Sequence, residues 1–125
     1  MVNLLFIHPD NKVAALYQEK LGKHFVFDSA QDGLTALRKM KIVQPHIMVS
    51  EWGLPMLSGL GLLKAVRKSP SFHHIGFFFI SDEEYISHAL SHGANGWLKY
   101  SEASPDALSD IIWKHLRVNR HILNY

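Results

Sequence analysis

The sequence contains no cysteine among its 125 residues. Disulfide bonds, thiolate metal sites and cysteine nucleophiles are therefore excluded together. The chain also has no P-loop and no glycine-rich dinucleotide fingerprint, which argues against nucleotide enzymes. It has no Gly-x-Ser-x-Gly motif either, which argues against a serine nucleophile. We expect no enzymatic activity.

Long apolar segments and a basic leader are also missing. The start, from Met1 to Ile7, lacks a small-residue cleavage site, and its apolar run is too short to span a bilayer. We expect it to be a buried strand of a cytoplasmic protein. No repeat, low-complexity tract or linker divides the chain, and 47% of its residues are hydrophobic. Residues 1–125 are therefore expected to form one folded domain.

Short apolar runs alternate five times with helical patterns along the chain. This alternation predicts an α/β fold with a five-stranded parallel sheet. The predicted strands are Val2 to Ile7, Lys23 to Asp28, a third opening at Pro45, Ile75 to Ile80, and Gly96 to Tyr100.

The predicted helices carry apolar residues at helical spacing. We expect Asp10 to cap the first helix, the second to start between Ser29 and Asp32, and Ser58 to cap the third. A fourth is expected from Asp82 to His92, and the last begins at Ser104-Pro105. The apolar faces expected for the first two helices are Val13, Leu16, Tyr17 and Leu21, and Leu34, Leu37, Met40 and Ile42.

Ligands of parallel sheets gather at the carboxyl ends of the strands. One such strand end lies in the run from Pro45 to Leu60, where Glu51 stands four residues before Pro55. The sequence of this run resembles that of a response-regulator receiver domain of the chemotaxis type. Gln31 to Leu37 and Gly93 to Leu98 carry the same resemblance. It covers essentially the whole chain and implies a flavodoxin-like (βα)5 three-layer sandwich and a role in two-component phosphorelay signalling.

Glu51 occupies the position at which receivers carry the phosphorylated aspartate. Glutamate adds one methylene and leaves a permanent negative charge at the strand end. One interpretation is a fixed stand-in for phosphoaspartate, with about one charge where a phosphoryl group brings −1.5 to −2. The other is a structural carboxylate that sits in water or pairs with Lys99.

Receivers end their first strand with two adjacent acids that hold Mg²⁺, and the corresponding residues here are His8 and Pro9, followed by Asp10. Mg²⁺ prefers hard oxygen ligands, and Asp10 is expected to cap a helix instead. We therefore expect no Mg²⁺ and no other cofactor. His88 and His92 share a helix face, but the histidines lack the pattern of a zinc site and are expected to be solvated.

The remaining receiver positions fall on the last two predicted strands. The resemblance assigns Ser81 to the hydroxyl that hydrogen-bonds the phosphoryl group, although a serine there can equally cap the following helix. Trp97 matches the switch aromatic, and its large indole favours one locked conformation. The family's lysine position is held by Tyr100, whereas Lys99 stands one residue early and would point to the opposite face of a strand.

These features predict a degenerate receiver, or pseudo-receiver, that acts as a phosphorylation-independent interaction module. By resemblance, a protein partner or a second copy is expected at the fourth helix, fifth strand and fifth helix. Aromatic residues of that region can serve as anchors or as core residues. They are Tyr85, Trp97, Tyr100 and Trp113.

Two alternatives stay open at this point. One is a phosphate-accepting receiver that uses non-standard acids, Asp10 or Asp82. The other is a basic nucleic-acid-binding module that works through the last helix, whose cations are Lys114, Arg117 and Arg120.

Overall fold

The computed structural model describes residues 1–82 and 87–120. Its elements are β1 (Asn3–Ile7), α1 (Asn11–Leu21), β2 (Val26–Ala30), α2 (Gly33–Val43), β3 (Ile47–Ser50), α3 (Gly59–Lys68), β4 (Gly76–Ile80), α4 (Ser87–Ser91), β5 (Gly96–Leu98), the 3₁₀ helix η2 (Tyr100–Glu102) and α5 (Pro105–Val118). The strands form one five-stranded sheet in the order β2-β1-β3-β4-β5, with every pairing parallel. The predicted α/β fold class is confirmed.

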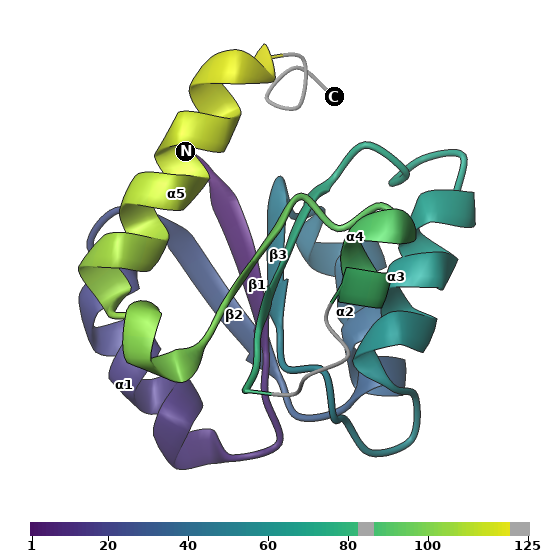
Figure 1. The fold of residues 1–125 in the computed structure, drawn as a ribbon, viewed down its shortest axis with the longest axis horizontal. Helices are drawn as coiled ribbons and strands as arrows, with labels where there is room; N and C mark the ends of the chain where they lie inside the picture. Colours follow the sequence, from purple (N-terminus) through teal and green to yellow (C-terminus); the bar gives the residue numbers. More distant parts are fainter. Residues whose placement is uncertain (83–86, 121–125) are drawn as a thin grey trace.

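The sheet is the middle of three layers, with α1 and α5 on one face and α2, α3 and α4 on the other (Figure 1). Successive side chains of a strand point to opposite faces. Leu4 and Phe6 of β1 accordingly belong to the core on the α1 and α5 side, whereas Leu5 and Ile7 belong to the other core. Strands β3 and β4 are buried throughout, as expected for central strands covered on both faces.

Side-chain caps fix where the helices begin. The Asp10 carboxylate accepts from the Lys12 backbone N–H at 2.8 Å. The Ser58 hydroxyl accepts from the Gly61 N–H at 3.0 Å, and that of Ser104 accepts from Ala107 at 3.1 Å. Each bond satisfies an N–H that the first helical turn leaves without a partner. The predicted caps are confirmed.

The predicted apolar faces of α1 and α2 are wrong in part. Leu16 is 64% exposed and Ile42 is 83% exposed, whereas Ala14 and Ala36 face the sheet. The buried face of α2 runs through Ala36 and Met40. Ile42 lies two residues beyond Met40, about 200° further around the helix, so it points to solvent. Leu34, at 40% exposure, also lies largely outside the core.

Strand boundaries also differ from the prediction, most of all in β2, which runs from Val26 to Ala30 instead of from Lys23 to Asp28, and in β5. β2 starts at Val26, because the preceding residues form a turn in which Phe25 is buried against Trp113, with ring centroids 5.2 Å apart. β5 ends at Leu98, two residues before the predicted end at Tyr100. Of the predicted fourth helix, residues 83–86, with Tyr85 among them, lie outside the described residues. No described helix is both long and apolar enough to cross a bilayer.

Arg67 of α3 ties that helix to two loops. Its guanidinium donates to the carbonyl oxygens of Gly93 at 2.9 Å, His73 at 2.8 Å and Ile75 at 2.6 Å, and to Asn95 Oδ1 at 2.9 Å. Carbonyl dipoles thus surround a largely buried positive charge. The loops before β4 and before β5 are positioned by this one side chain.

Candidate functional site

A cleft of about 420 Å³ lies at the carboxyl edge of the sheet, the lower edge in Figure 1. Its lining comes from the residues that follow β1, β3, β4 and β5, because parallel strands bring these ends to one edge. The lining residues are His8, Pro9, Glu51, Gly53, Ser81, Asp82 and Tyr100. Glu51, His8, Ser81 and Tyr100, which the sequence singled out, therefore do come together.

The Glu51 carboxylate is held by three donors. Oε1 accepts from the backbone N–H of Trp52 at 2.7 Å and from that of Gly53 at 3.4 Å. Oε2 accepts a short hydrogen bond from the Tyr100 hydroxyl. Both carboxylate oxygens therefore accept hydrogen bonds from the protein, and Glu51 is not a freely solvated strand-end carboxylate.

Tyr100, and not Lys99, contacts Glu51. Across residues 1–82 and 87–120 the one ion pair joins Lys39 to Asp28, at 3.0 Å. The alternative in which Glu51 pairs with Lys99 is therefore wrong. The Lys99 side chain is exposed, because the strand ends at Leu98 and the chain turns into η2 there.

Backbone contacts aim the Tyr100 ring at the cleft. The Tyr100 N–H donates to Asp82 Oδ1 at 3.1 Å, and the Lys99 N–H donates to Glu102 Oε1, also at 3.1 Å. Two carboxylates thus cap the first turn of η2. Asp82, an alternative phosphate acceptor in the sequence analysis, here orients Tyr100.

His8 extends the contact between Tyr100 and Glu51. Its Nδ1 accepts from the Asp10 N–H at 3.0 Å, and its Nε2 lies 2.8 Å from the Tyr100 hydroxyl oxygen. In a neutral ring the Nδ1 contact puts the proton on Nε2, which donates to Tyr100. Tyr100 in turn donates its own proton to Glu51. All three bonds then run in one direction, from the Asp10 amide to the Glu51 carboxylate.

Burial sets the protonation states of this network. It lowers the pKa of His8, although the negative charges of Glu51 and Asp10 act in the opposite direction. Burial, followed by the hydrogen bond to Glu51, strongly raises the pKa of Tyr100. At neutral pH the His8 imidazole and the Tyr100 phenol are therefore both neutral.

Gly59 allows the loop after β3 to fold back beside Glu51. The Gly59 N–H donates to the Trp52 carbonyl at 2.9 Å. A Cβ at this position would lie 2.6 Å from the Glu51 carbonyl oxygen and 2.9 Å from that of Trp52. Only glycine fits here without displacing the backbone that holds the carboxylate.

The Trp97 side chain contacts the backbone of Ser81. Ser81 is 1% exposed, and its carbonyl oxygen accepts from the Trp97 indole N–H at 2.7 Å. The indole also packs against the core on the α2 and α3 side. Trp97 is thus turned inward and tied at its polar end, the geometry in which its single N–H is satisfied.

The cleft offers Mg²⁺ a poor set of ligands. The residues after β1 are an imidazole and a proline, and both oxygens of Glu51 already accept hydrogen bonds. Asp10 caps α1, as predicted. No group of three or more histidine and carboxylate side chains suited to a metal comes together in the described parts of the chain. These residues do not fit the octahedral oxygen shell that Mg²⁺ requires.

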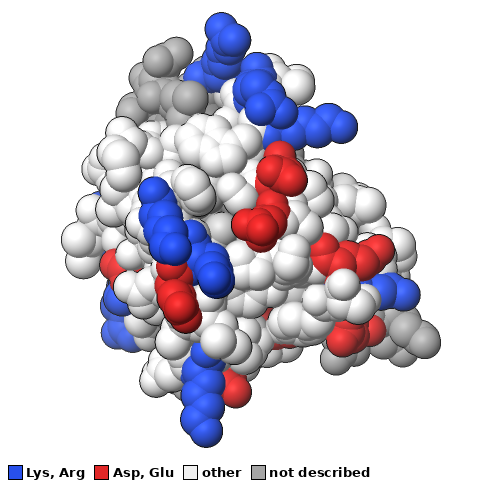
Figure 2. Space-filling view, turned by 90° about the vertical axis from the view of Figure 1, so that its left-hand side faces the viewer, with Lys and Arg blue, Asp and Glu red and all other residues white. Residues whose placement is uncertain are grey.

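The cations at the end of α5 lie at one end of the face formed by α1 and α5. Lys114, Arg117 and Arg120 are exposed. Figure 2 shows lysine and arginine gathered at that end, with acidic side chains directly beside them. The face therefore carries both signs of charge, which is unlike the continuous basic stripe of a nucleic-acid-binding surface.

Sequence reasoning missed the donors of the Glu51 carboxylate. It identified Tyr100 only as an occupant of the lysine position, and it did not find the Trp52 and Gly53 amides or the role of Asp82. The early end of β5 at Leu98 decides this geometry, and no periodic pattern of the sequence reports it.

Comparisons with known proteins agree with this fold. No family model matches the chain. Chemotaxis protein CheY-3 of Vibrio cholerae is 35% identical over 72 residues, which are 55% of this chain and 55% of that protein. The matched part thus spans about half the length of such curated relatives.

Solved structures match over more of the chain. A Francisella response regulator receiver domain is 25% identical with a TM-score of 0.79, covering 92% of this chain and 98% of that one. A receiver domain protein from Clostridium thermocellum has a TM-score of 0.86 at 16% identity, covering 98% and 99%. The fold is that of a receiver domain. In sequence, the chain is similar to chemotaxis response regulators over about half of its length.

Proposed function

We propose that residues 1–125 form one atypical receiver domain, a pseudo-receiver, that binds a protein partner without being phosphorylated. The observation that carries this proposal is the engagement of Glu51 by the Tyr100 hydroxyl and the Trp52 amide. A phosphoacceptor must attack a phosphoryl donor with a carboxylate oxygen. Here each oxygen accepts a hydrogen bond, which lowers its nucleophilicity, and Tyr100 lines the cleft beside it.

The charge of Glu51 supports a single signalling state. It supplies about one negative charge, against −1.5 to −2 for a phosphoryl group, so it resembles the modified state only in part. The tie between Trp97 and the Ser81 carbonyl favours one position of the switch aromatic. The domain would thus present one surface permanently.

Absence of Mg²⁺ chemistry belongs to the same proposal. A receiver that accepts phosphate needs a metal to neutralise the incoming group, and the ligands here are unsuited to it. Asp10 and Asp82, the alternative acceptors, each accept a backbone N–H and hold local structure. We infer a binding module that acts in the cytoplasm and catalyses no reaction.

The proposed partner surface consists of α4, β5 and α5. Leu90 of α4 is 53% exposed and can be buried by a partner. Trp97 is half-buried, so part of its indole is available as an anchor. Trp113 stacks on Phe25 and is committed largely to the core.

Intact mass spectrometry after incubation with acetyl phosphate and Mg²⁺ tests the absence of acceptor chemistry. We expect no phosphoryl adduct on the wild-type chain. Glu51→Asp should also stay unmodified, because the two acids before α1 are still lacking. A receiver with an ordinary aspartate acceptor serves as the reagent control. An adduct on the wild-type chain would refute the proposal.

The role of Glu51 in partner binding needs a separate test. Glu51→Gln removes the charge and keeps the shape, so the oligomeric state or the affinity for a partner should change. Light scattering after size-exclusion chromatography reports the first, and titration calorimetry the second. Glu19→Gln, an exposed acid of α1, is the matched control. If both variants behave like the wild type, Glu51 is only structural.

A further inference from the structure

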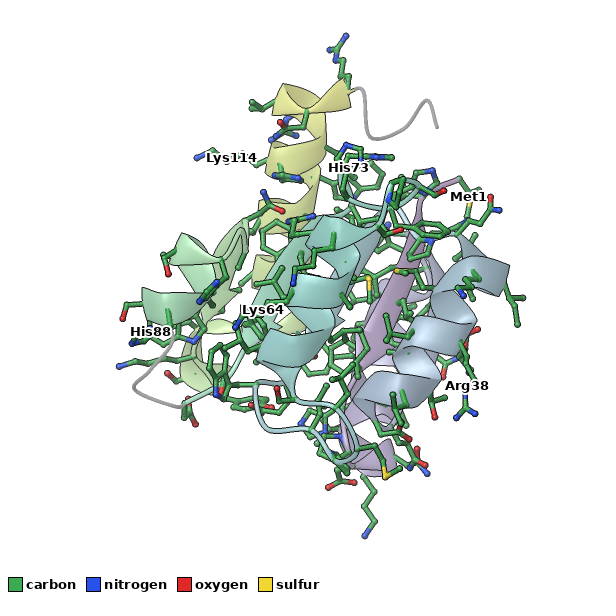
Figure 3. The ribbon with its side chains drawn as sticks, turned by 90° about the vertical axis from the view of Figure 1, so that its right-hand side faces the viewer. Met1, Arg38, Lys64, His73, His88 and Lys114 are labelled. Carbon is green, nitrogen blue, oxygen red and sulfur yellow. The ribbon has the colours of Figure 1, made fainter. Side chains whose placement is uncertain are left out.

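A groove of about 600 Å³ lies between α2 and α3, on the face opposite α1 and α5. Figure 3 shows these two helices side by side. Apolar side chains of both line the groove, namely Leu37, Met40, Ile42 and Ala65. Arg38, Lys41 and Ser69 complete the lining. The groove lies at a different place from the cleft of Glu51 and shares no residue with it.

Ile42 exposes a large apolar side chain at this groove. Its side chain is 83% exposed, although Met40, two residues earlier, is buried. Covering an isoleucine side chain stabilises a complex by roughly 1.5 to 3 kcal/mol. Exposed apolar residues beside a concave apolar surface are typical of a site that binds a protein segment.

Cations outnumber carboxylates along α2 and α3, although Asp32, the N-cap of α2, interacts with the charge of Arg38, and Asp28 pairs with Lys39. From Gly33 to Ser81 the sequence contains one acidic residue, Glu51, which lies in the other cleft. The cations of α2 and α3 are Arg38, Lys39, Lys41, Lys64, Arg67 and Lys68.

Two of these cations serve the fold. Lys39 pairs with Asp28, and Arg67 binds loop carbonyls. The other four, Arg38, Lys41, Lys64 and Lys68, are exposed. In Figure 3, Arg38 stands at the outer edge of α2 and Lys64 on α3. Two cations, Arg38 and Lys41, therefore line the apolar groove, whereas Lys64 lies on the side of α3 turned away from α2 (Figure 3).

We propose that the groove between α2 and α3 binds an amphipathic acidic helix of a partner protein. Apolar side chains of such a helix, spaced three and four residues apart, would fill the groove and cover Ile42. Its flanking Asp and Glu side chains would face Arg38 and Lys41, the two cations of the groove lining. This proposal goes beyond the proposed function and stands independently of it.

The apolar lining of the groove distinguishes an acidic helix from other anionic partners. A nucleic acid would bring phosphates to the cations but would leave Leu37 and Ile42 against a charged backbone. A flat membrane surface would contact Ile42, which protrudes, but it would not fill the concave part of the groove lined by Leu37, Met40 and Ala65. A helix matches both the groove and the cations.

Fluorescence anisotropy with a defined probe tests the proposal. The probe is a labelled peptide of about 14 residues, about 21 Å long as a helix, with leucines on one face and glutamates elsewhere. Its control has the same composition with the leucines scattered around the helix. We expect the amphipathic peptide to bind and the scattered one to bind about tenfold more weakly. No binding of the amphipathic peptide at millimolar protein would overturn the proposal.

Variants then locate the binding site. Ile42→Glu and Lys41→Glu should each weaken binding of the amphipathic peptide about tenfold. The first adds a negative charge to the apolar lining of the groove, and the second reverses the charge of a lining cation. Leu16→Glu and Lys20→Glu are the matched controls, because both residues are exposed on α1. We expect less than about a twofold change from either. Equal losses in all four variants would contradict a site between α2 and α3.

Two further probes separate the other anionic partners. A labelled DNA duplex and vesicles containing an anionic lipid are titrated with the same proteins. We expect neither to bind at the affinity of the amphipathic peptide. If the duplex or the vesicles bind more tightly than the peptide, and Lys41→Glu abolishes this binding while Ile42→Ser does not, the groove is an electrostatic surface and the proposed partner is wrong.

Discussion

Replacing Tyr100 by phenylalanine removes one hydroxyl from the centre of the cleft. In Tyr100→Phe the Oε2 atom of Glu51 loses its donor, and Nε2 of His8 loses its acceptor. The ring itself is kept, so packing changes little. The variant therefore measures the contribution of this hydrogen-bond network to the free energy of unfolding.

The structure sets the size of this effect. A hydrogen bond to a charged group contributes about 1.5 to 3 kcal/mol, and one between neutral groups about 0.5 to 1.5 kcal/mol. The cleft is open, so water can replace part of both bonds in the variant. We expect the free energy of unfolding to fall by about 1 to 3 kcal/mol at neutral pH. The fall reaches the upper end of this range if water replaces little of the two lost hydrogen bonds.

Urea unfolding followed by circular dichroism measures the loss. Tyr17→Phe is the matched control, because the Tyr17 hydroxyl donates to a neutral acceptor, the Ala103 carbonyl oxygen, at 2.5 Å. The double mutant cycle of Tyr100→Phe with Glu51→Leu isolates the contact to the carboxylate, because leucine offers no acceptor to the Tyr100 hydroxyl. We expect a coupling energy of about 1 kcal/mol or more. A coupling energy near zero would refute the argument that Tyr100 holds Glu51.

Three further predictions concern pH and stability. The lowered pKa of His8 favours its neutral form, so this contribution to stability is present above its unfolded value of 6.5 and is lost as the pH falls through the folded pKa. Urea unfolding across this pH range should show that His8→Gln loses less stability than the wild type as the pH falls. The pH dependence due to His46, whose pKa is also lowered, should remain in this variant. Arg67→Lys should cost about 2 to 4 kcal/mol in the same assay, because one ammonium cannot reach all four acceptors; a loss below 1 kcal/mol would contradict this. Gln44→Gly should raise the melting temperature by a few degrees, since Gln44 has a left-handed backbone at φ 52°, and an unchanged melting temperature would show that this conformation costs nothing.

The sequence was sufficient for the fold because its signals are local and redundant. Buried strands such as Ile47–Ser50 are continuous apolar runs, and the helix starts carry Asp10, Ser58 and Ser104. The facing of helices was predicted less well. The buried faces of α1 and α2 include small residues, Ala14 and Ala36, and the pattern gave more weight to the larger Leu16 and Ile42.

The site could be predicted as a set of positions and not as a network. Glu51, His8, Ser81 and Tyr100 meet because they follow parallel strands, and that much follows from the alternation of elements. Which side chain touches Glu51 depends on where β5 stops. A difference of two residues moves Tyr100 from a strand to η2, and no periodic pattern reports such a short turn.

The hydrogen bonds around Glu51 bear on how long a signal from this domain would last. A phosphoaspartate is made by one reaction and removed by another, so its signal decays at a chemical rate. The bonds from Tyr100 and Trp52 form when the chain folds, and they contain no leaving group. Under the proposed function, the signal would last as long as the polypeptide, and the cell would set its strength through synthesis and degradation of the protein.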